Sequence, residues 1–469
     1  MRRALLDLAP LRTSRAFRRL WVGQTLSGFG GQMTVVAVMF QVWQSTHSTI
    51  WTGAVALAQA VPLVALGLFA GAVVDRVDRR TFYVAMTAGQ AVSSVLLAVQ
   101  AFVGGVPVVG VVLLVAVQSC FVAGGGPASK TFVVALLPPE QLAAGLTLRR
   151  ISFQGALLAG PAVAGLVLGW LGVGACYAID AVSFAGTLYG ACKLPSLTVP
   201  AGAAARSGLR GVRDGVDFLV RTPLVRGALL TDLATTVLSM PISLFPLINA
   251  ERFGDDPRTL GLFLSAIAVG GLVASLFSGT FTRLTRPGLA VLGGSAVWGL
   301  ALALFGLAPD RWLGLACLVL AGAADTVSVV SRSTVVQAHT PPELLGRVGA
   351  AEQIVGQAGP DVGNLRGGVV ADATSGVTAL VSGGILCVVA VVLVGAATPQ
   401  LWRGAGGAAG AGGAAGVGGA AGAAGSGDPG ETGGSGRPDG SADSSLPGGV
   451  EDSGAPGGRG DPGGVTAQR

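Results

Sequence analysis

The chain has 469 residues, of which 51% are hydrophobic and only 12% are charged, and its mean hydropathy is +0.67. Soluble domains carry about 25% charged residues, so this deficit of charge excludes an ordinary soluble protein and indicates a membrane protein. The formal net charge is +6, but the arginines lie between apolar segments and form no continuous basic face, so no nucleic-acid partner is expected.

Twelve apolar segments are long enough to cross a bilayer, because a helix needs roughly 20 residues to span a hydrocarbon core of ~30 Å. The predicted spans are 20–43, 52–74, 82–103, 107–136, 143–169, 176–194, 227–249, 260–281, 288–308, 312–337, 347–371 and 376–397. The sequence therefore predicts an all-α membrane bundle with an N-terminal six-helix half at 20–194 and a C-terminal six-helix half at 227–397. A cytoplasmic segment (1–19), a central cytoplasmic loop (195–226) and a disordered Gly/Ala-rich tail (398–469) complete the chain.

The basic residues of the predicted loops fall mainly on one side of this bundle. Eighteen lysines and arginines lie on the side that carries both termini, and only Arg252, Arg258 and Arg311 lie on the other side. By the positive-inside rule both termini are predicted to be cytoplasmic, with the protein in the cell (inner) membrane. The N-terminus lacks the short apolar core and cleavage site of a signal peptide.

Few residues are suited to metal, redox or nucleotide chemistry. The five cysteines lie in or beside apolar segments without CxxC spacing, so they are interpreted as small buried hydrophobic residues. The chain has no Gly-x-x-x-x-Gly-Lys motif for nucleotide phosphates. We therefore expect no metal site and no cofactor.

The segment from Gly67 to Arg80 reads GLFAGAVVDRVDRR. Gly67 and Gly71 share one face of a helix and allow another helix to approach closely. A charged turn follows, and the pattern resembles the loop between helices 2 and 3 of the major facilitator superfamily of secondary transporters, with Asp78 where that superfamily usually has Gly. The resemblance implies a gating loop formed by Gly67, Gly71, Asp75, Arg76, Arg79 and Arg80.

The fifth span carries small residues and a proline in the sequence GALLAGPAVAG. Gly155, Gly160, Pro161 and Gly165 resemble the antiporter-type motif of exporters in the superfamily, with alanines at two of its glycine positions. Ordinary packing of small residues is the alternative interpretation. The fourth span lacks the arginine that many proton-coupled members carry there, and Gln118 is its nearest polar residue.

Charged residues inside the spans are candidates for function, because each costs ~2.5–3.5 kcal/mol on insertion. Asp325 and Arg332 are two helical turns apart on one face, where they line a cavity or pair with another helix. Glu352 and Asp361 are proton carriers or helix-to-helix hydrogen-bond partners. Asp232 is expected at the membrane interface, and Arg149 and Arg150 are expected to anchor helices. The candidate proton or substrate residues are Asp180, Asp325, Arg332, Glu352, Asp361 and Arg366.

The later segments resemble the enterobactin-exporter branch of the superfamily, chiefly through the loop from Thr340 to Arg347. The resemblance implies an exporter of a small organic molecule, such as a catechol siderophore. We expect protons as the coupling ion, the lipid bilayer as its surroundings and a monomer as its oligomeric state. A broad multidrug or macrolide exporter is the first alternative. A multi-span membrane enzyme is a remote alternative, because the two histidines, His47 and His339, fall on opposite predicted sides of the membrane.

Overall fold

The computed structural model describes residues 7–74, 77–195, 217–277, 286–341 and 344–403. Within these ranges the chain is helical and contains no strand. Most of the predicted central loop, nearly all of the predicted tail, and Asp75 and Arg76 of the predicted gating loop lie outside the described residues.

The first group of helices comprises α2 to α6, which pack against one another. Helix α2 begins five residues before the predicted span because the Ser14 hydroxyl caps its N-terminus, accepting a hydrogen bond from the Phe17 amide at 3.2 Å. The elements are α1 (Ala9–Thr13), α2 (Arg15–Thr46), α3 (Thr49–Val74), α4 (Arg79–Val103), α5 (Val108–Leu136), η1 (Pro139–Gln141) and α6 (Leu142–Cys192).

Helix α6 contains two passes, separated at Gly172. This residue has φ 78° and ψ −179°, a backbone conformation that is essentially restricted to glycine. The chain therefore reverses at Gly172, in the gap between the predicted fifth and sixth spans.

The second group of helices extends from α8 to α15. The predicted single span at 227–249 is interrupted, because α8 ends at Ser239 and Pro241 supplies no backbone donor to continue it. The elements are α8 (Pro223–Ser239), η2 (Ile242–Leu244), α9 (Phe245–Arg252), α10 (Pro257–Leu276), α12 (Pro287–Leu307), α13 (Arg311–His339), α14 (Leu345–Ala373), α15 (Gly376–Ala397) and α16 (Gln400–Arg403).

Nine helical segments of the described chain are long and apolar enough to cross a membrane, and one of them, Pro139–Cys192, has the length for two passes. Helices α2 and α14 have the length but a more polar composition, and each packs lengthwise against other helices. Counted with these two, the described helices have the length for twelve crossings. Large apolar side chains such as Val103, Val182 and Leu276 are more than 70% exposed, as expected of a surface that faces lipid.

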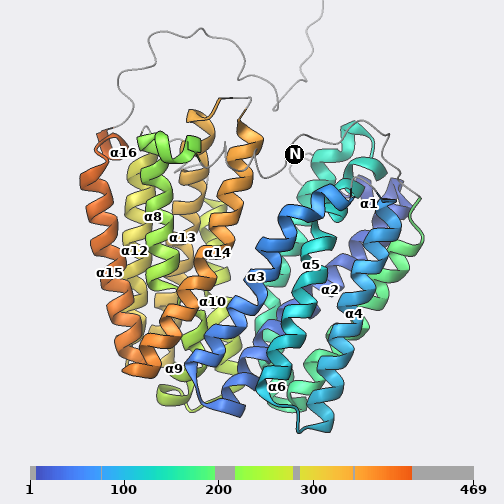
Figure 1. The fold of residues 1–469 in the computed structure, drawn as a ribbon, viewed down its shortest axis with the longest axis horizontal. Helices are drawn as coiled ribbons and strands as arrows, with labels where there is room; N and C mark the ends of the chain where they lie inside the picture. The colour runs from blue at the N-terminus through green and yellow to red at the C-terminus, as the bar shows by residue number, and fades with distance from the viewer. Residues whose placement is uncertain (1–6, 75–76, 196–216, 278–285, 342–343, 404–469) are drawn as a thin grey trace, which may run out of the picture. The chain divides into compact units, whose positions relative to one another are not determined.

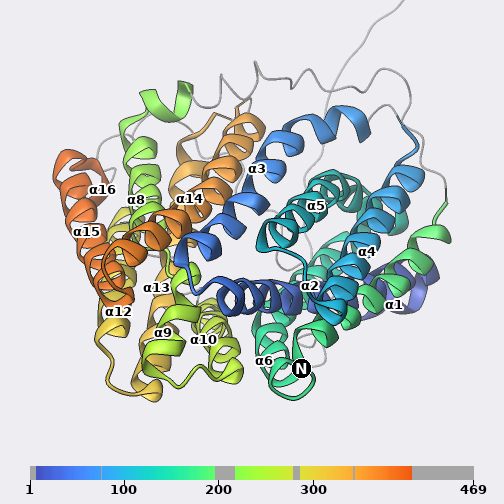
Figure 2. The same cartoon turned by 60° about the horizontal axis from the view of Figure 1, so that its bottom comes forward.

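The two groups meet along two pairs of helices, α3 with α14 and α6 with α10. Figures 1 and 2 both show α3 and α14 side by side. Hydrogen bonds between the groups lie close to the turn that joins α2 to α3. Gln44 donates to Asp255 at 2.6 Å, Ser48 donates to Asp372 at 3.3 Å, and Thr52 donates to the Ser243 carbonyl at 2.9 Å.

Candidate functional site

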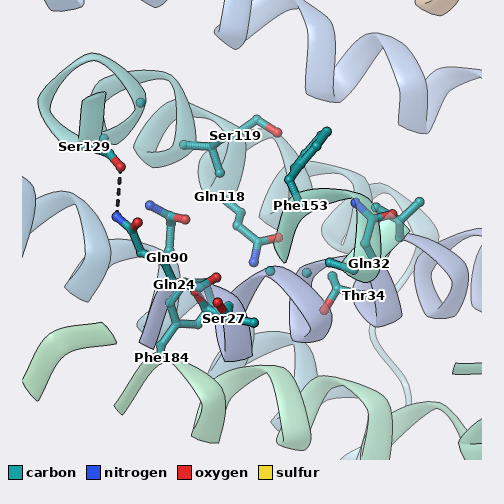
Figure 3. A pocket seen from close by; sticks show the side chains of 18 of the residues that line it. Gln24, Ser27, Gln32, Thr34, Gln90, Gln118, Ser119, Ser129, Phe153 and Phe184 are labelled. Atoms are coloured by element: carbon teal, nitrogen blue, oxygen red, sulfur yellow. Dashed lines mark hydrogen bonds between the residues drawn. The ribbon is translucent and has the colours of Figure 1, made fainter. Parts of the chain in front are cut away.

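A cavity of about 540 Å³ lies within the first group of helices. Figure 3 shows the amides of Gln24, Gln90 and Gln118 and the ring of Phe153 around it. Five glutamines and several hydroxyls supply its polar atoms, and aromatic and aliphatic side chains supply the rest of the wall. The lining residues include Trp21, Gln24, Gln32, Thr34, Gln59, Tyr83, Gln90, Gln118, Ser129, Arg149, Phe153 and Phe184.

Helix α2 provides one wall of this cavity. Its lining residues recur at three- and four-residue steps, from Trp21 and Gln24 to Gln32, Val35 and Val38, which places them on one helical face. Neutral polar side chains on this face, together with Arg15, Arg18 and Arg19 at its N-terminal end, make α2 less apolar than its neighbours. The glutamines of this face were not predicted as site residues from the sequence, although their helical spacing was the available signal.

Arg149 supplies positive charge to one end of the cavity. Its guanidinium donates to the Ser129 carbonyl at 3.3 Å and to the Ser129 hydroxyl at 3.2 Å, so it joins α6 to α5 as the sequence predicted. Gln24 donates to the same hydroxyl and to the Tyr83 hydroxyl, both at 2.8 Å. Among the described residues that line the cavity, Arg149 alone is charged, and none is a carboxylate.

Asp180 lies behind the cavity wall and is 0% exposed. Its Oδ2 accepts hydrogen bonds from Thr34 at 2.9 Å and from Ser94 at 2.7 Å. Ser94 in turn accepts a hydrogen bond from the Gln118 amide at 2.9 Å. Because Thr34 and Gln118 both line the cavity, this candidate residue connects to it through two short routes.

The small residues of the predicted antiporter-type helix lie at close contacts between helices. A Cβ at Gly160 would be 2.6 Å from Gln32 Cβ on α2, and a Cβ at Gly165 would be 2.8 Å from the Pro257 carbonyl oxygen, beside α10. Gly261 of α10 packs on the Pro161 carbonyl. Gly155 is less crowded, because a Cβ there would be 3.9 Å from its neighbour Phe29 Cζ. These residues thus permit α6 to contact both groups of helices.

The second group of helices contains a buried cluster of charges around Arg332. One guanidinium nitrogen lies 3.2 Å from Asp232 on α8 and 3.3 Å from Glu352 on α14. Asp232 is 7% exposed and pairs with Arg332 inside the helix bundle, and its expected position at the membrane interface stays a prediction. Asp325, on the same helix as Arg332, interacts electrostatically with Asp232 and Arg332.

The remaining candidates of the eleventh span differ in their contacts. Arg366 donates to the Leu238 carbonyl, which α8 leaves without a helical partner where it ends at Ser239. Asp361 is partly buried and makes no hydrogen bond or ion pair with a described residue. Arg366 is therefore placed as a brace for α8, while Asp361 remains a candidate only.

The described part of the predicted gating loop shows helix capping. Asp78 caps α4, accepting hydrogen bonds from the Arg80 amide at 3.2 Å and the Thr81 hydroxyl at 2.9 Å. Arg80 donates to the Cys192 carbonyl at the end of α6. Gly67 and Gly71 lie in α3, and Arg79 is the first residue of α4. No group of three His, Cys, Asp or Glu with metal-ligand geometry occurs in the described ranges.

Comparison with known proteins supports one family. The model of the transmembrane secretion effector family matches residues 6–402. The enterobactin exporter EntS of Shigella boydii serotype 18 is 29% identical over 392 residues, covering 83% of this chain and 94% of that protein. EntS of Escherichia coli O1:K1 is 28% identical over the same length, with the same coverage.

Solved structures show the same fold at low sequence identity. The nucleoside transporter NupG (D323A mutant) has a TM-score of 0.68 at 14% identity and covers 82% of this chain and 99% of its own. A bacterial homologue of the iron transporter ferroportin, in an inward-facing state, has a TM-score of 0.62 at 15% identity, with 82% and 98% coverage. The chain therefore belongs to the transmembrane secretion effector family of the major facilitator superfamily and is a multi-pass membrane transporter.

Proposed function

We propose that this transporter exports a small organic molecule across the inner membrane, and that the molecule is a catechol siderophore such as enterobactin. Proton entry drives the export. A monomer is sufficient for transport, because one chain carries both groups of helices. The similarity to EntS over most of both chains supports the choice of substrate. A multi-span enzyme is disfavoured, since the family and its structural neighbours are transporters.

The proposed orientation places both termini in the cytoplasm, in keeping with the excess of basic residues on that side. The turn between α2 and α3 is then periplasmic. On this orientation the hydrogen bonds of Gln44 with Asp255 and of Ser48 with Asp372 hold the two groups together on the periplasmic side. Export then requires these contacts to open while the groups rock about the substrate.

The observation that carries the proposal is the chemistry of the cavity. Arg149 is its single charged lining residue in the described chain, and carboxylates are absent from the described lining. A catechol is aromatic, donates hydrogen bonds and acquires negative charge when its hydroxyls ionise. Arg149 attracts that charge, the glutamines bind the hydroxyls, and Phe153 stacks on the ring.

A broad multidrug or macrolide exporter is the second candidate. The aromatic residues Trp21, Phe153 and Phe184 in the lining favour it, because apolar drugs bind to such surfaces. Lipophilic cations, in contrast, gain no carboxylate partner from the described lining and meet the positive charge of Arg149.

The test is transport in inverted membrane vesicles with an imposed pH gradient, comparing labelled enterobactin with a cationic dye. Gradient-driven movement of enterobactin alone is expected. Arg149→Gln should reduce this transport about tenfold or more, because a charge-assisted hydrogen bond contributes about 1.5–3 kcal/mol. Arg150→Gln is the matched control, since Arg150 is exposed and does not line the cavity.

Movement of the dye would favour multidrug export instead. Movement of neither compound would contradict both substrate proposals. Equal transport by the Arg149→Gln and Arg150→Gln variants would contradict the role of Arg149.

A further inference from the structure

Asp180 is a buried carboxyl group near the middle of the first group of helices. It is 0% exposed, and its partner Thr34 lies twelve residues before the end of α2 at Thr46. The ion pairs of the described chain do not include Asp180. An ionised carboxylate without a cation is costly in such surroundings, so a neutral, protonated form is accessible to it.

The groups that face Asp180 come from three helices and carry no charge. Thr34 and Gly30 face it from α2 and Ser94 faces it from α4, while Gln118 of α5 interacts with it and also donates to Ser94. On its own helix Tyr177 donates to Gln41 at 2.8 Å, and Cys176 contacts the Ala164 carbonyl. Glycine is required at position 30, because a Cβ there would be 2.5 Å from Asp180 Oδ1.

Arg149 is too distant to neutralise Asp180. Arg149 and Gln24 of α2 both donate hydrogen bonds to the Ser129 hydroxyl, so Arg149 lies at the level of Gln24. Asp180 accepts a hydrogen bond from Thr34, which is ten residues further along α2. Ten helical residues correspond to about 15 Å. In the second group of helices, by comparison, Arg332 lies directly beside Asp232 and Glu352.

The hydrogen bonds at Asp180 all run in one direction. The Gln118 amide nitrogen donates to Ser94, Ser94 donates to Asp180 Oδ2, and Thr34 donates to the same oxygen. This is the arrangement that an ionised carboxylate requires, because it can only accept. It leaves Gln118 Oε1, a hydrogen-bond acceptor, for the cavity that Gln118 lines (Figure 3).

A proton on Asp180 reverses this chain. Oδ1 has no hydrogen-bond partner among the described residues, so a proton placed there leaves a buried donor unsatisfied. A proton on Oδ2 has two acceptors in reach, the hydroxyls of Thr34 and Ser94; where it donates to Ser94, that hydroxyl then donates to Gln118 Oε1. In that arrangement the Gln118 amide turns over, and its NH₂ donor faces the cavity in place of its carbonyl acceptor.

We propose that Asp180 is the proton-binding site of this transporter and that it acts through Ser94 on Gln118, which holds substrate hydroxyls only while Asp180 is ionised. The inference rests on the proposed proton-driven export. A substrate rich in hydroxyl donors binds from the cytoplasm to the carbonyl of Gln118. Proton binding from the periplasm turns the amide, removes that acceptor and releases the substrate.

The test uses the full chain in proteoliposomes and two transport modes of labelled enterobactin. Accumulation driven by a pH gradient requires the proton step, whereas exchange of internal for external enterobactin does not. Asp180→Asn should lose gradient-driven accumulation and retain exchange, because asparagine still accepts from Thr34 and Ser94 but does not ionise. Asp361→Asn is the matched control, as Asp361 also lacks a basic partner in the described chain and lies on α14.

A second measurement does not depend on the substrate. Infrared difference spectra between low and high pH detect the C=O stretch of protonated carboxyl groups. Asp180→Asn should lose part of this band, and Asp361→Asn should retain that part.

The outcomes separate this inference from the proposed function. The inference is overturned if Asp180→Asn accumulates enterobactin with the gradient as well as the unaltered protein does. It is also overturned if Asp361→Asn loses gradient-driven accumulation and Asp180→Asn does not. If the unaltered protein moves no enterobactin with the gradient, the proposed function fails, and the infrared band then decides whether Asp180 takes up a proton. An unchanged band in Asp180→Asn overturns the inference in that case.

Discussion

Removal of the Arg332 side chain charge should strongly destabilise the second group of helices. Arg332 lies 3.2 Å from Asp232 and 3.3 Å from Glu352, and the three side chains are 8%, 9% and 17% exposed. At such separations the attraction of two unit charges is about 5 kcal/mol at an effective dielectric constant of about 20. Arg332→Met leaves both carboxylates without this partner.

The expected loss in free energy of unfolding is about 3–5 kcal/mol, the usual cost of removing one partner of a buried ion pair. A triple variant, Arg332→Met with Asp232→Asn and Glu352→Gln, should recover part of that loss, because neither position 232 nor position 352 then carries an unpaired charge, whereas Asp325 still loses its attraction to Arg332. Arg150→Met, at an exposed arginine, should change stability by less than about 0.5 kcal/mol.

The assay is equilibrium unfolding in mixed micelles, followed by tryptophan fluorescence, with thermal melting as a second measurement. If Arg332→Met lowers the free energy of unfolding by less than about 1 kcal/mol, the buried ion pairs do not have the proposed effect, because a buried unpaired charge costs several times more. A triple variant no more stable than the single variant would refute the electrostatic cause.

Three further predictions concern the loop and the glycines. Asp75→Asn should reduce transport without preventing membrane insertion, because Asp75 is predicted to brace the inner gate through helix-end dipoles; unchanged vesicle transport would contradict this. Gly172→Ala should lower unfolding free energy by about 1–3 kcal/mol, measured by melting, because φ 78° and ψ −179° strain any other residue. Gly261→Leu should abolish transport in a protein that still inserts into the membrane, because the leucine side chain collides with the Pro161 carbonyl. Gly293→Leu is the control and should transport normally, because Gly293 has open space around it. Equal transport by the two variants would disprove a role for the contact between Gly261 and Pro161.

The sequence by itself was sufficient to locate the helices. Apolar length defines a span, so α4 and α15 agree with the predicted segments 82–103 and 376–397 to within three residues. The break between α8 and α9 was not predicted, because Met240 and Pro241 interrupt a segment that remains apolar throughout. Hydropathy measures transfer into lipid and does not register a missing backbone donor.

The charged residues in the spans were recognisable from their cost in lipid, but their partners were not. Asp232, Arg332 and Glu352 meet from three helices, and this meeting was not predicted from the sequence. An isolated helix pattern indicates which face a residue occupies but not which helix lies opposite that face.

The polar cavity was decided by the tertiary structure. Gln24, Gln90 and Gln118 are neutral, so their cost in lipid is lower than that of a charge, and they drew little attention in the sequence. Their convergence depends on α2, α4 and α5 packing at close range, as does the link from Gln118 through Ser94 to Asp180. Hydrogen bonds between side chains more than twenty residues apart form only once the helices are packed, whereas the apolar length of each span is already present in the chain.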